Sequence, residues 1–405
     1  MMADDVALVP PEAVEAARRG LAGVLRPTPT WPNRALSLLC HRPVLAKHEH
    51  LQRTGSFKFR GAHHLLSGLD ADQDLVVAAS AGNHAQGVAL AAQLLGKRSV
   101  VFMPAGASLP KISATRAYGA EVRFGPPVVD DCILEARAWA EEHGGRFVPP
   151  FDDPAIIAGQ GTLGLELAEE APEAGVVVVP VGGGGLLAGV AVALRSRRPG
   201  IRIIGVEAAG AASMRRSLDR FEPSACPPMH TIADGIAIKS PSALTLAHAE
   251  ALVDDVVSVT DDEIGRALLV LLERSKQVVE PAGAAAAAAL LAGKVPGDDP
   301  AVVVLSGGNV DPLVLGRLIH HGMTAVGRYL RLRVVVPDAP GALARIVDEV
   351  AGTGLNILDV EHHREGARVA VDEVEIALVL ETRDPAHRLE VLDRLRARGY
   401  GVEQL

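Results

Sequence analysis

A run of apolar residues that ends in four consecutive glycines constrains the fold of this 405-residue chain more than any other stretch. Residues 176–181 are five valines and one proline, Gly182 to Gly185 follow them, and residues 186–195 have the composition of a helix. A short continuous apolar run is typical of a strand that is buried on both faces. Because glycines lack side chains, the backbone N–H groups of residues 182–185 can converge at the start of the helix and favour an anion such as phosphate.

The same alternation of apolar strand and helix occurs on both sides of this run. Further strands are expected at residues 75–79, 99–103, 120–124, 201–207 and 301–305. Strands that alternate with helices predict an α/β fold with parallel layers, in which ligands bind at the carboxyl ends of the strands.

After about residue 330 the pattern changes. The expected elements are, in order, a strand at 330–336, a helix at 341–352, two strands at 355–362 and 369–380 joined across 364–366, a helix capped by Asp384, and a short final strand. This βαββαβ order predicts a ferredoxin-like domain. We therefore expect two domains, at residues 1–325 and 330–405.

Composition and charge exclude several classes of protein. The net charge of -9 comes without basic runs, so we expect no nucleic-acid partner. The longest run of small apolar residues, 282–292, is too short to cross a membrane and predicts a buried helix instead. The first residues lack the pattern of a secretory signal, and Cys40, Cys132 and Cys226 have no metal-ligand spacing, which together favour a cytoplasmic chain.

Lys58 occupies the expected start of another helix, between Phe57 and Phe59 in sequence. Ser56 is in position to cap a helix that begins at Phe57. The positive end of a helix and apolar neighbours disfavour the ammonium form, so more of the amine is free to act as a nucleophile. The sequence thus offers Lys58 as a candidate nucleophile, with an ordinary solvated lysine as the alternative.

Two polar loops follow expected strands. Residues 80–84, Ser-Ala-Gly-Asn-His, form a loop at a helix start that suits a carboxylate, and the Asn83 amide could bond a ring hydroxyl. Residues 306–309, Ser-Gly-Gly-Asn, put the Ser306 hydroxyl at the edge of a sheet. For the loop at 80–84 a plain turn is the alternative, because glycine and asparagine dominate turns.

The glycine run also allows a different hypothesis. Gly183, Gly185 and Ala188 match the GxGxxG/A pattern of dinucleotide-binding folds, and Glu207 ends the next strand where a ribose-binding acid would lie. An oxidoreductase of that kind would leave Lys58 and Ser306 without a role. A third hypothesis, a non-enzymatic amino-acid sensor, would account only for residues after 330.

Taken together and in this order, residues 56–62, 80–87, the four glycines and residues 306–309 resemble the motifs of the threonine ammonia-lyases. These enzymes, also called threonine dehydratases, belong to the tryptophan-synthase-β-like, fold-type-II enzymes that depend on pyridoxal 5'-phosphate. The resemblance covers about residues 10–322. Residues 337–343 and 354–357 are similar to an ACT domain, a small amino-acid-sensing module.

The resemblance implies a role for each motif. Lys58, beside Phe57, would hold the cofactor as a Schiff base and then act as the base at Cα. Asn83 would bond the ring hydroxyl and Ser306 the pyridine nitrogen. The phosphate would lie on Gly182, Gly183, Gly184 and Gly185, and the substrate carboxylate on Ser80, Ala81, Gly82, Asn83 and His84. Since a serine hydroxyl cannot supply a stable proton to the ring nitrogen, the cofactor would be a weaker electron sink and would favour elimination over transamination.

Two positions depart from relatives. Serine racemases carry a serine immediately before Gly-Asn-His as a second proton donor, whereas this chain has Ala81, so racemisation is not expected. Some relatives bind a cation near the residue that matches Glu207, but the following polar position here is Ser213. One carboxylate is a poor site for magnesium or calcium, and we expect no metal.

The implied reaction is the conversion of L-threonine to 2-oxobutanoate and ammonia, with L-serine to pyruvate as a second activity. Both a role in isoleucine biosynthesis and one in threonine breakdown remain open. In ACT domains the turn that corresponds to Pro337–Leu343 forms an amino-acid pocket with a neighbouring copy. We therefore expect an amino-acid effector such as isoleucine or valine, and a homo-oligomer, either a dimer or a tetramer.

Overall fold

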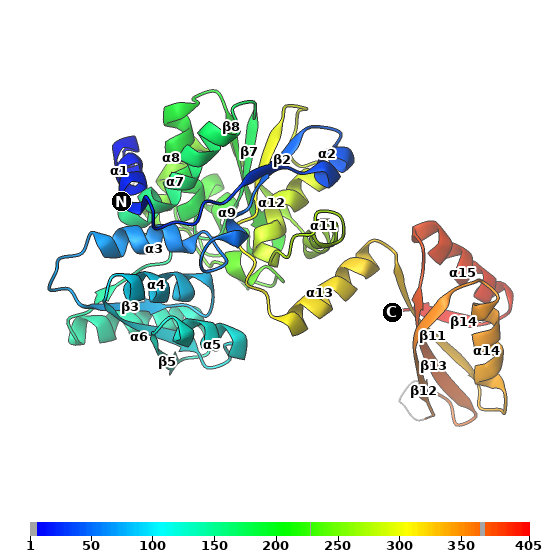
Figure 1. The fold of residues 1–405 in the computed structure, drawn as a ribbon. Helices are drawn as coiled ribbons and strands as arrows, with labels where there is room; N and C mark the ends of the chain where they lie inside the picture. The colour runs from blue at the N-terminus through cyan, green and yellow to red at the C-terminus, as the bar shows by residue number, and fades with distance from the viewer. Residues whose placement is uncertain (1–5, 227, 365–368) are drawn as a thin grey trace. The chain divides into compact units, whose positions relative to one another are not determined.

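The computed structural model describes residues 6–226, 228–364 and 369–405, and the chain separates into two compact units, Met1–Pro312 and Leu313–Leu405 (Figure 1). The first unit contains a mostly parallel sheet and a smaller parallel sheet, and the second unit contains an antiparallel sheet. The α/β architecture with a ferredoxin-like second unit confirms the predicted fold class.

The larger sheet of the first unit has six strands in the order β1-β2-β10-β7-β8-β9. All neighbours pair in parallel except β1, which pairs antiparallel to β2. The strands are β1 (Thr30–Pro32), β2 (Val44–Lys47), β7 (Val176–Pro180), β8 (Arg202–Ala208), β9 (Asp255–Val259) and β10 (Ala301–Val304). Strands β7 and β10 are buried along their whole length, as their valine-rich sequences predict.

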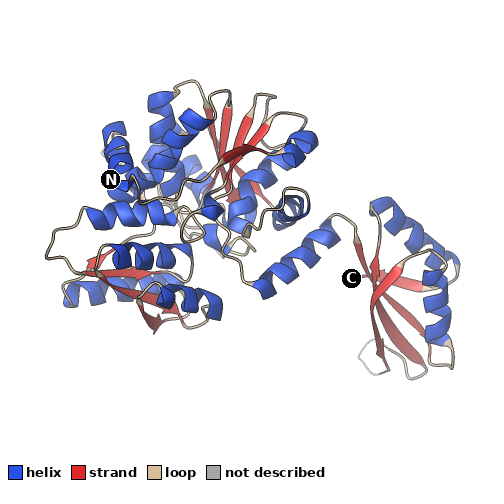
Figure 2. Ribbon diagram, viewed as in Figure 1, coloured by secondary structure: helices blue, strands red, loops and turns tan. Residues whose placement is uncertain are grey.

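Helices pack around this sheet (Figure 2). The predicted buried helix is confirmed as α12 (Pro281–Leu291), which contacts β7 to β10 and is buried at every position from Pro281 to Leu290. The other helices of this part are α1 (Pro11–Leu21), α2 (Arg34–Cys40), α7 (Pro154–Glu170), α8 (Gly185–Arg197), α9 (Ser213–Arg220), α10 (Ala243–Leu252) and α11 (Asp261–Glu273).

The smaller sheet has four parallel strands in the order β5-β4-β3-β6. They are β3 (Leu75–Ala79), β4 (Arg98–Pro104), β5 (Glu121–Gly125) and β6 (Arg146–Phe147). The helices that accompany them are α3 (Lys58–Ser67), α4 (Asn83–Leu94), α5 (Leu109–Ala117) and α6 (Val129–Glu142).

The second unit begins with helix α13 (Pro312–Ala325) and continues as the predicted βαββαβ order, with strands paired as β12-β13-β11-β14. The elements are β11 (Tyr329–Pro337), α14 (Ala342–Ala351), β12 (Asn356–His363), β13 (Glu373–Glu381), α15 (Pro385–Ala397) and β14 (Gly401–Gln404). The Asp384 carboxylate accepts the N–H of His387, which confirms the expected cap. The turn expected across residues 364–366 lies mostly outside the described residues.

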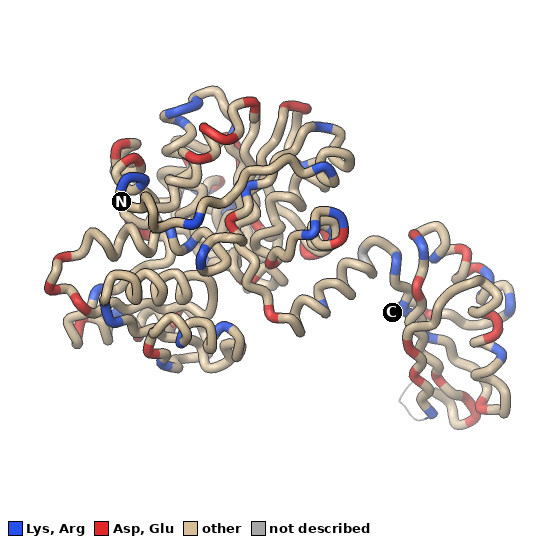
Figure 3. Tube along the Cα trace, viewed as in Figure 1, with Lys and Arg blue, Asp and Glu red and all other residues tan. Residues whose placement is uncertain are grey.

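Acidic and basic residues are interspersed along both units (Figure 3). Among the helices that the described residues form, none has the length and apolar character needed to cross a bilayer.

Candidate active site

Backbone pairing brings the Lys58 and Ser306 segments together. Ser56 pairs with Gly307 in an isolated bridge, and the N–H of Phe57 donates to the carbonyl of Ser306 at 3.1 Å. Helix α3 begins at Lys58, one residue later than predicted. The expected cap by Ser56 is wrong: its hydroxyl is buried without a hydrogen-bond partner among the described residues, because the bridge to Gly307 fixes its backbone before the helix begins.

The Lys58 amine lies in an apolar, partly enclosed place. Its Nζ donates to the carbonyl of Pro150 at 2.8 Å and is 5.2 Å from the centroid of the Phe57 ring. Burial lowers the pKa of Lys58 to about 8, against the opposing charge of Glu280. Phe59 is not a second neighbour of the amine, because its ring is fully buried in the core between α3, β3 and α4. The amine therefore loses its proton at a lower pH than an ordinary lysine does.

The loop at residues 80–84 lies between β3 and α4. The Ser80 hydroxyl accepts the N–H of Gly82 at 3.1 Å, and α4 begins at Asn83. Ala81 is partly exposed. The His84 ring is buried and bonds the carbonyl of Val148 at 2.9 Å, and burial lowers its pKa to about 3, so it stays neutral.

Glu280 is a site residue that the sequence analysis did not identify. Its carboxylate accepts a hydrogen bond from Asn83 Nδ2 at 2.6 Å, and the Asn83 Oδ1 accepts one from Asn309 Nδ2 at 2.8 Å. Burial, followed by the charge of Asp234, raises the pKa of Glu280 to about 7. The one available signal was a lone glutamate before Pro281, at the start of an entirely apolar helix.

The four glycines are enclosed by side chains. A Cβ at Gly183 would lie 2.1 Å from the Phe151 ring, and one at Gly184 would lie 2.6 Å from Met214 Cε. Gly184 also has φ +91°, which favours glycine. A side chain at either glycine would force its neighbours to move, so the first backbone N–H groups of α8, which lack intrahelical partners, form the lining.

The residues present fit pyridoxal phosphate. The glycine cradle at the start of α8 suits its phosphate, and Lys58 offers an amine whose burial favours the free form. The buried Ser306 follows β10 and its carbonyl accepts the N–H of Phe57, and Asn83, at the start of α4, bonds Asn309 of the Ser306 loop. Ser306, Asn83 and the glycine run all follow carboxyl ends of parallel strands, where the fold predicts a ligand.

The Glu207 carboxylate is occupied by backbone hydrogen bonds and is therefore not free to bind the ribose of a dinucleotide. Its carboxylate accepts the N–H groups of Met214 at 2.6 Å and Arg215 at 2.9 Å at the start of α9. Burial raises the pKa of Glu207 to about 7. The described residues contain no group of three or more His, Cys, Asp or Glu side chains placed to hold a metal ion.

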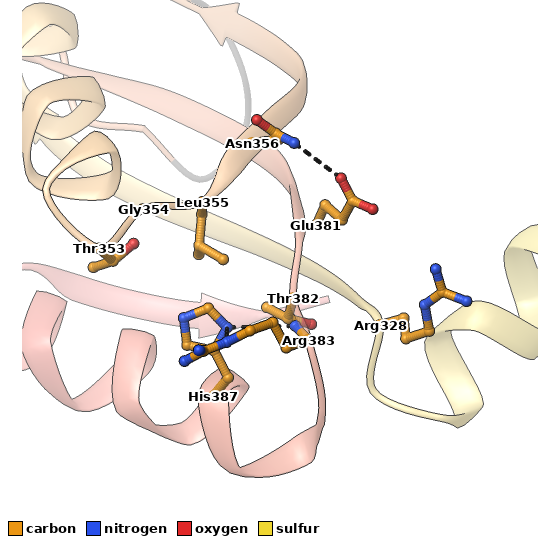
Figure 4. Close-up of a pocket in the computed structure, with 9 residues that line it drawn as sticks. All are labelled: Arg328, Thr353, Gly354, Leu355, Asn356, Glu381, Thr382, Arg383 and His387. Carbon is orange, nitrogen blue, oxygen red and sulfur yellow. Dashed lines mark hydrogen bonds between the residues drawn. The ribbon is translucent and has the colours of Figure 1, made fainter.

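The second unit contains a pocket of about 630 Å³ (Figure 4). It lies between the loop that follows α14 and the start of α15, and the carboxyl end of β13 completes it. The Arg383 Nε donates to the ring of His387 at 3.1 Å, and Asn356 donates to Glu381 at 3.1 Å. The turn at Pro337–Leu343 lies at the other end of β11 from this pocket.

Comparisons with known proteins agree with this geometry. Residues 21–307 match the model of the pyridoxal-phosphate dependent enzyme family, and residues 330–398 match the ACT domain. The chain is 45% identical over 366 residues to an L-threonine ammonia-lyase of Geobacter sulfurreducens, covering 90% of this chain and 91% of that protein. It is 42% identical over 393 residues to an L-threonine ammonia-lyase of Thermotoga maritima, covering 96% and 98%.

A solved structure of T.th. threonine deaminase superposes with a TM-score of 0.71 at 41% identity, over 74% of this chain and 98% of that one. The chain therefore belongs to the threonine ammonia-lyases of the pyridoxal-phosphate-dependent enzyme family and carries a C-terminal ACT domain.

Proposed function

We propose that this protein removes ammonia from L-threonine to give 2-oxobutanoate, and that it converts L-serine to pyruvate in the same way. The observation that carries the proposal is the convergence of the Lys58 amine, the Asn83 amide, the Ser306 segment and the glycine cradle. The names of the relatives support threonine as the first substrate.

Pyridoxal phosphate, when bound, supplies an electron sink for the charge that develops at Cα. The first N–H groups of α8 would hold its phosphate, and the Ser306 hydroxyl would be the partner of the ring nitrogen without giving it a stable proton. Asn83 would donate to the ring hydroxyl. The loop at residues 80–84 holds the substrate carboxylate, which leaves the Cα proton within reach of Lys58.

Lys58 acts as the base at Cα. Its amine must be unprotonated to take the proton, and burial, which lowers its pKa to about 8, favours that form. The β-hydroxyl group then leaves as water. Water re-enters when ammonia is released, so the net change is the loss of ammonia alone.

We assign residues 1–325 to catalysis and residues 330–405 to regulation by an amino acid at the Pro337–Leu343 turn. The turn contains Gly341 at φ +85°, directly before α14, so a ligand can approach its backbone. We infer a homo-oligomer, because such a turn in an ACT domain pairs with a second copy of the chain. We place the protein in the cytoplasm.

The test is an assay of purified protein with L-threonine. Ammonia and 2-oxobutanoate should appear in equal amounts, and Lys58→Ala should lose activity by at least about 10³-fold, while Lys97→Ala, at a partly exposed lysine between α4 and β4, keeps it. Borohydride reduction and peptide mapping should find the pyridoxyl group on Lys58. A label on Lys47 or Lys111, or a bound nicotinamide in place of pyridoxal phosphate, would overturn the assignment.

A further inference from the structure

Glu280 is a buried carboxylate held by the backbone at the start of α12. Its side chain and main chain together are only 6% exposed. Its N–H donates to the carbonyl of Gly307 at 3.1 Å, and Pro281 begins the helix after it. Glu280 therefore lies against the same turn that carries Ser306.

A chain of hydrogen bonds runs from Glu280 through the two asparagines of the site. Asn83 Nδ2 donates to Glu280, and Asn309 Nδ2 donates to Asn83 Oδ1 at 2.8 Å and to the carbonyl of Thr54 at 2.6 Å. The carbonyl oxygen of Thr54 at one end of the chain only accepts, which fixes the orientation of the Asn309 amide, and the Nδ2 that Asn309 offers to Asn83 fixes the Asn83 amide in turn. Asn83 Nδ2 has two hydrogens, and Glu280 takes one of them.

The close approach of Glu280 to this turn needs a glycine. A Cβ at Gly307 would lie 2.2 Å from Glu280 Oε1 and 3.0 Å from Asn83 Nδ2. The absence of a side chain at residue 307 therefore leaves room for the contact between Glu280 and Asn83.

The charges around Glu280 come from three elements. The negative charge of Glu280 acts on Lys58 of α3. Asp234, in the short helix Asp234–Ile236, disfavours the ionised form of Glu280, and Lys111 of α5 favours that form. Lys111 is itself paired with Asp234 at 2.7 Å. The negative charge of Glu280 favours the ammonium form of Lys58 and so opposes the effect of burial on the pKa of Lys58.

We propose that Glu280 is a positioning residue for the cofactor site: by accepting one Asn83 Nδ2 hydrogen, it turns the other toward the ring hydroxyl of pyridoxal phosphate. The inference rests on the cofactor assignment within the proposed function. It does not depend on which amino acid is the substrate.

Two substitutions separate the hydrogen-bond acceptor of Glu280 from its negative charge. Glu280→Gln keeps an oxygen that can accept from Asn83 but removes the charge, whereas Glu280→Ala removes both. Glu207→Gln is the matched control, because Glu207 is also a buried carboxylate before a helix and its pKa is also raised to about 7.

The cofactor is first removed from the unmodified protein and from each variant. Pyridoxal phosphate is then added back at a series of pH values, and the change in absorbance gives the rate at which it attaches covalently to Lys58. The free amine is the form that reacts, so the capture rate rises with pH through the pKa of Lys58. Without the Glu280 charge this pKa falls, and both Glu280 variants should reach half the maximal rate at a lower pH than the unmodified protein. Glu207→Gln should not.

The equilibrium dissociation constant of pyridoxal phosphate reports the orientation of Asn83. It should rise about tenfold in Glu280→Ala, which corresponds to the loss of one charged hydrogen bond, and by less than about threefold in Glu280→Gln. An unchanged dissociation constant in Glu280→Ala, or an equal rise in Glu207→Gln, would overturn the proposal. A protein that shows these cofactor effects but does not deaminate threonine would refute the proposed function and leave this inference standing.

Discussion

At the scale of single residues, the side chain at position 81 determines whether elimination or racemisation is expected, and this chain has an alanine there. Racemisation needs a proton donor on the face of Cα opposite Lys58, and an alanine cannot provide one. With L-serine we therefore expect pyruvate and little D-serine. Ala81→Ser should raise the ratio of D-serine to pyruvate at least about tenfold, because a positioned acid contributes roughly 10²- to 10⁴-fold.

The control for this prediction is Ala81→Gly, which changes the same loop without adding a hydroxyl. Its product ratio should match that of the unmodified protein. Chiral chromatography of the amino acids with a coupled assay for pyruvate gives both products. D-serine at a rate comparable to pyruvate from the unmodified protein would contradict the argument from Ala81.

Lys58, Asn83 and Ser306 could be proposed from the sequence because each follows a strand or begins a helix within a recognisable motif. Glu280 could not, since its partner Asn83 lies almost two hundred residues earlier and only the folded chain joins them. The cap by Ser56 failed for the same reason: capping was inferred locally, but the long-range bridge to Gly307 determines the backbone there.

At the scale of elements, the buried central strands such as β3, β7 and β10 were predictable from their apolar patterns, but the short strands β1 and β6, the strand β9 and the ion pairs that hold α3 in place were not. Arg60, two residues after Lys58, is fully buried and pairs with Glu49 at 2.8 Å and with Glu166 of α7 at 2.6 Å. Lys47 of β2 pairs with the same Glu166 at 2.8 Å. In the sequence these charges are scattered and resemble ordinary surface residues.

The start of α8 gives a prediction at this scale. Gly183→Ala places a methyl group 2.1 Å from the Phe151 ring, so either the ring or the loop must move. We expect overpacking to cost about 1–3 kcal/mol of unfolding free energy, and the affinity for pyridoxal phosphate to fall at least about tenfold as the N–H groups shift. Cofactor titration and thermal unfolding measure the two effects.

Gly200→Ala is the control for that change, because it lies just after α8 and a Cβ there meets nothing within 4 Å. It should keep both cofactor affinity and stability. The double variant Gly183→Ala/Phe151→Leu should recover part of the affinity, since the smaller side chain frees space. Normal cofactor affinity in Gly183→Ala would show that the cradle tolerates a side chain and that its close fit does not matter for phosphate.

At the scale of the whole molecule, catalysis and regulation are proposed for different units. All cofactor contacts proposed above lie before residue 310, and the solved threonine deaminase is covered over 98% of its length by only 74% of this chain. The region after residue 330 is therefore available for control. An effector changes activity only if it binds two states of the enzyme unequally, with a coupling of typically about 1–3 kcal/mol, or roughly 5- to 150-fold.

We predict that isoleucine or valine changes the activity of the full chain at least about fivefold and has no effect on a chain that ends at residue 328. Initial rates with L-threonine, measured over a range of effector concentrations, test this. Gly341→Val, at φ +85°, strains the turn and should weaken the response, whereas Arg383→Ala alters the separate pocket and should preserve it. If the full chain ignores every amino acid, or the shortened chain keeps the response, the ACT domain has no regulatory role. If Arg383→Ala abolishes the response and Gly341→Val does not, the effector binds at the pocket instead of the turn.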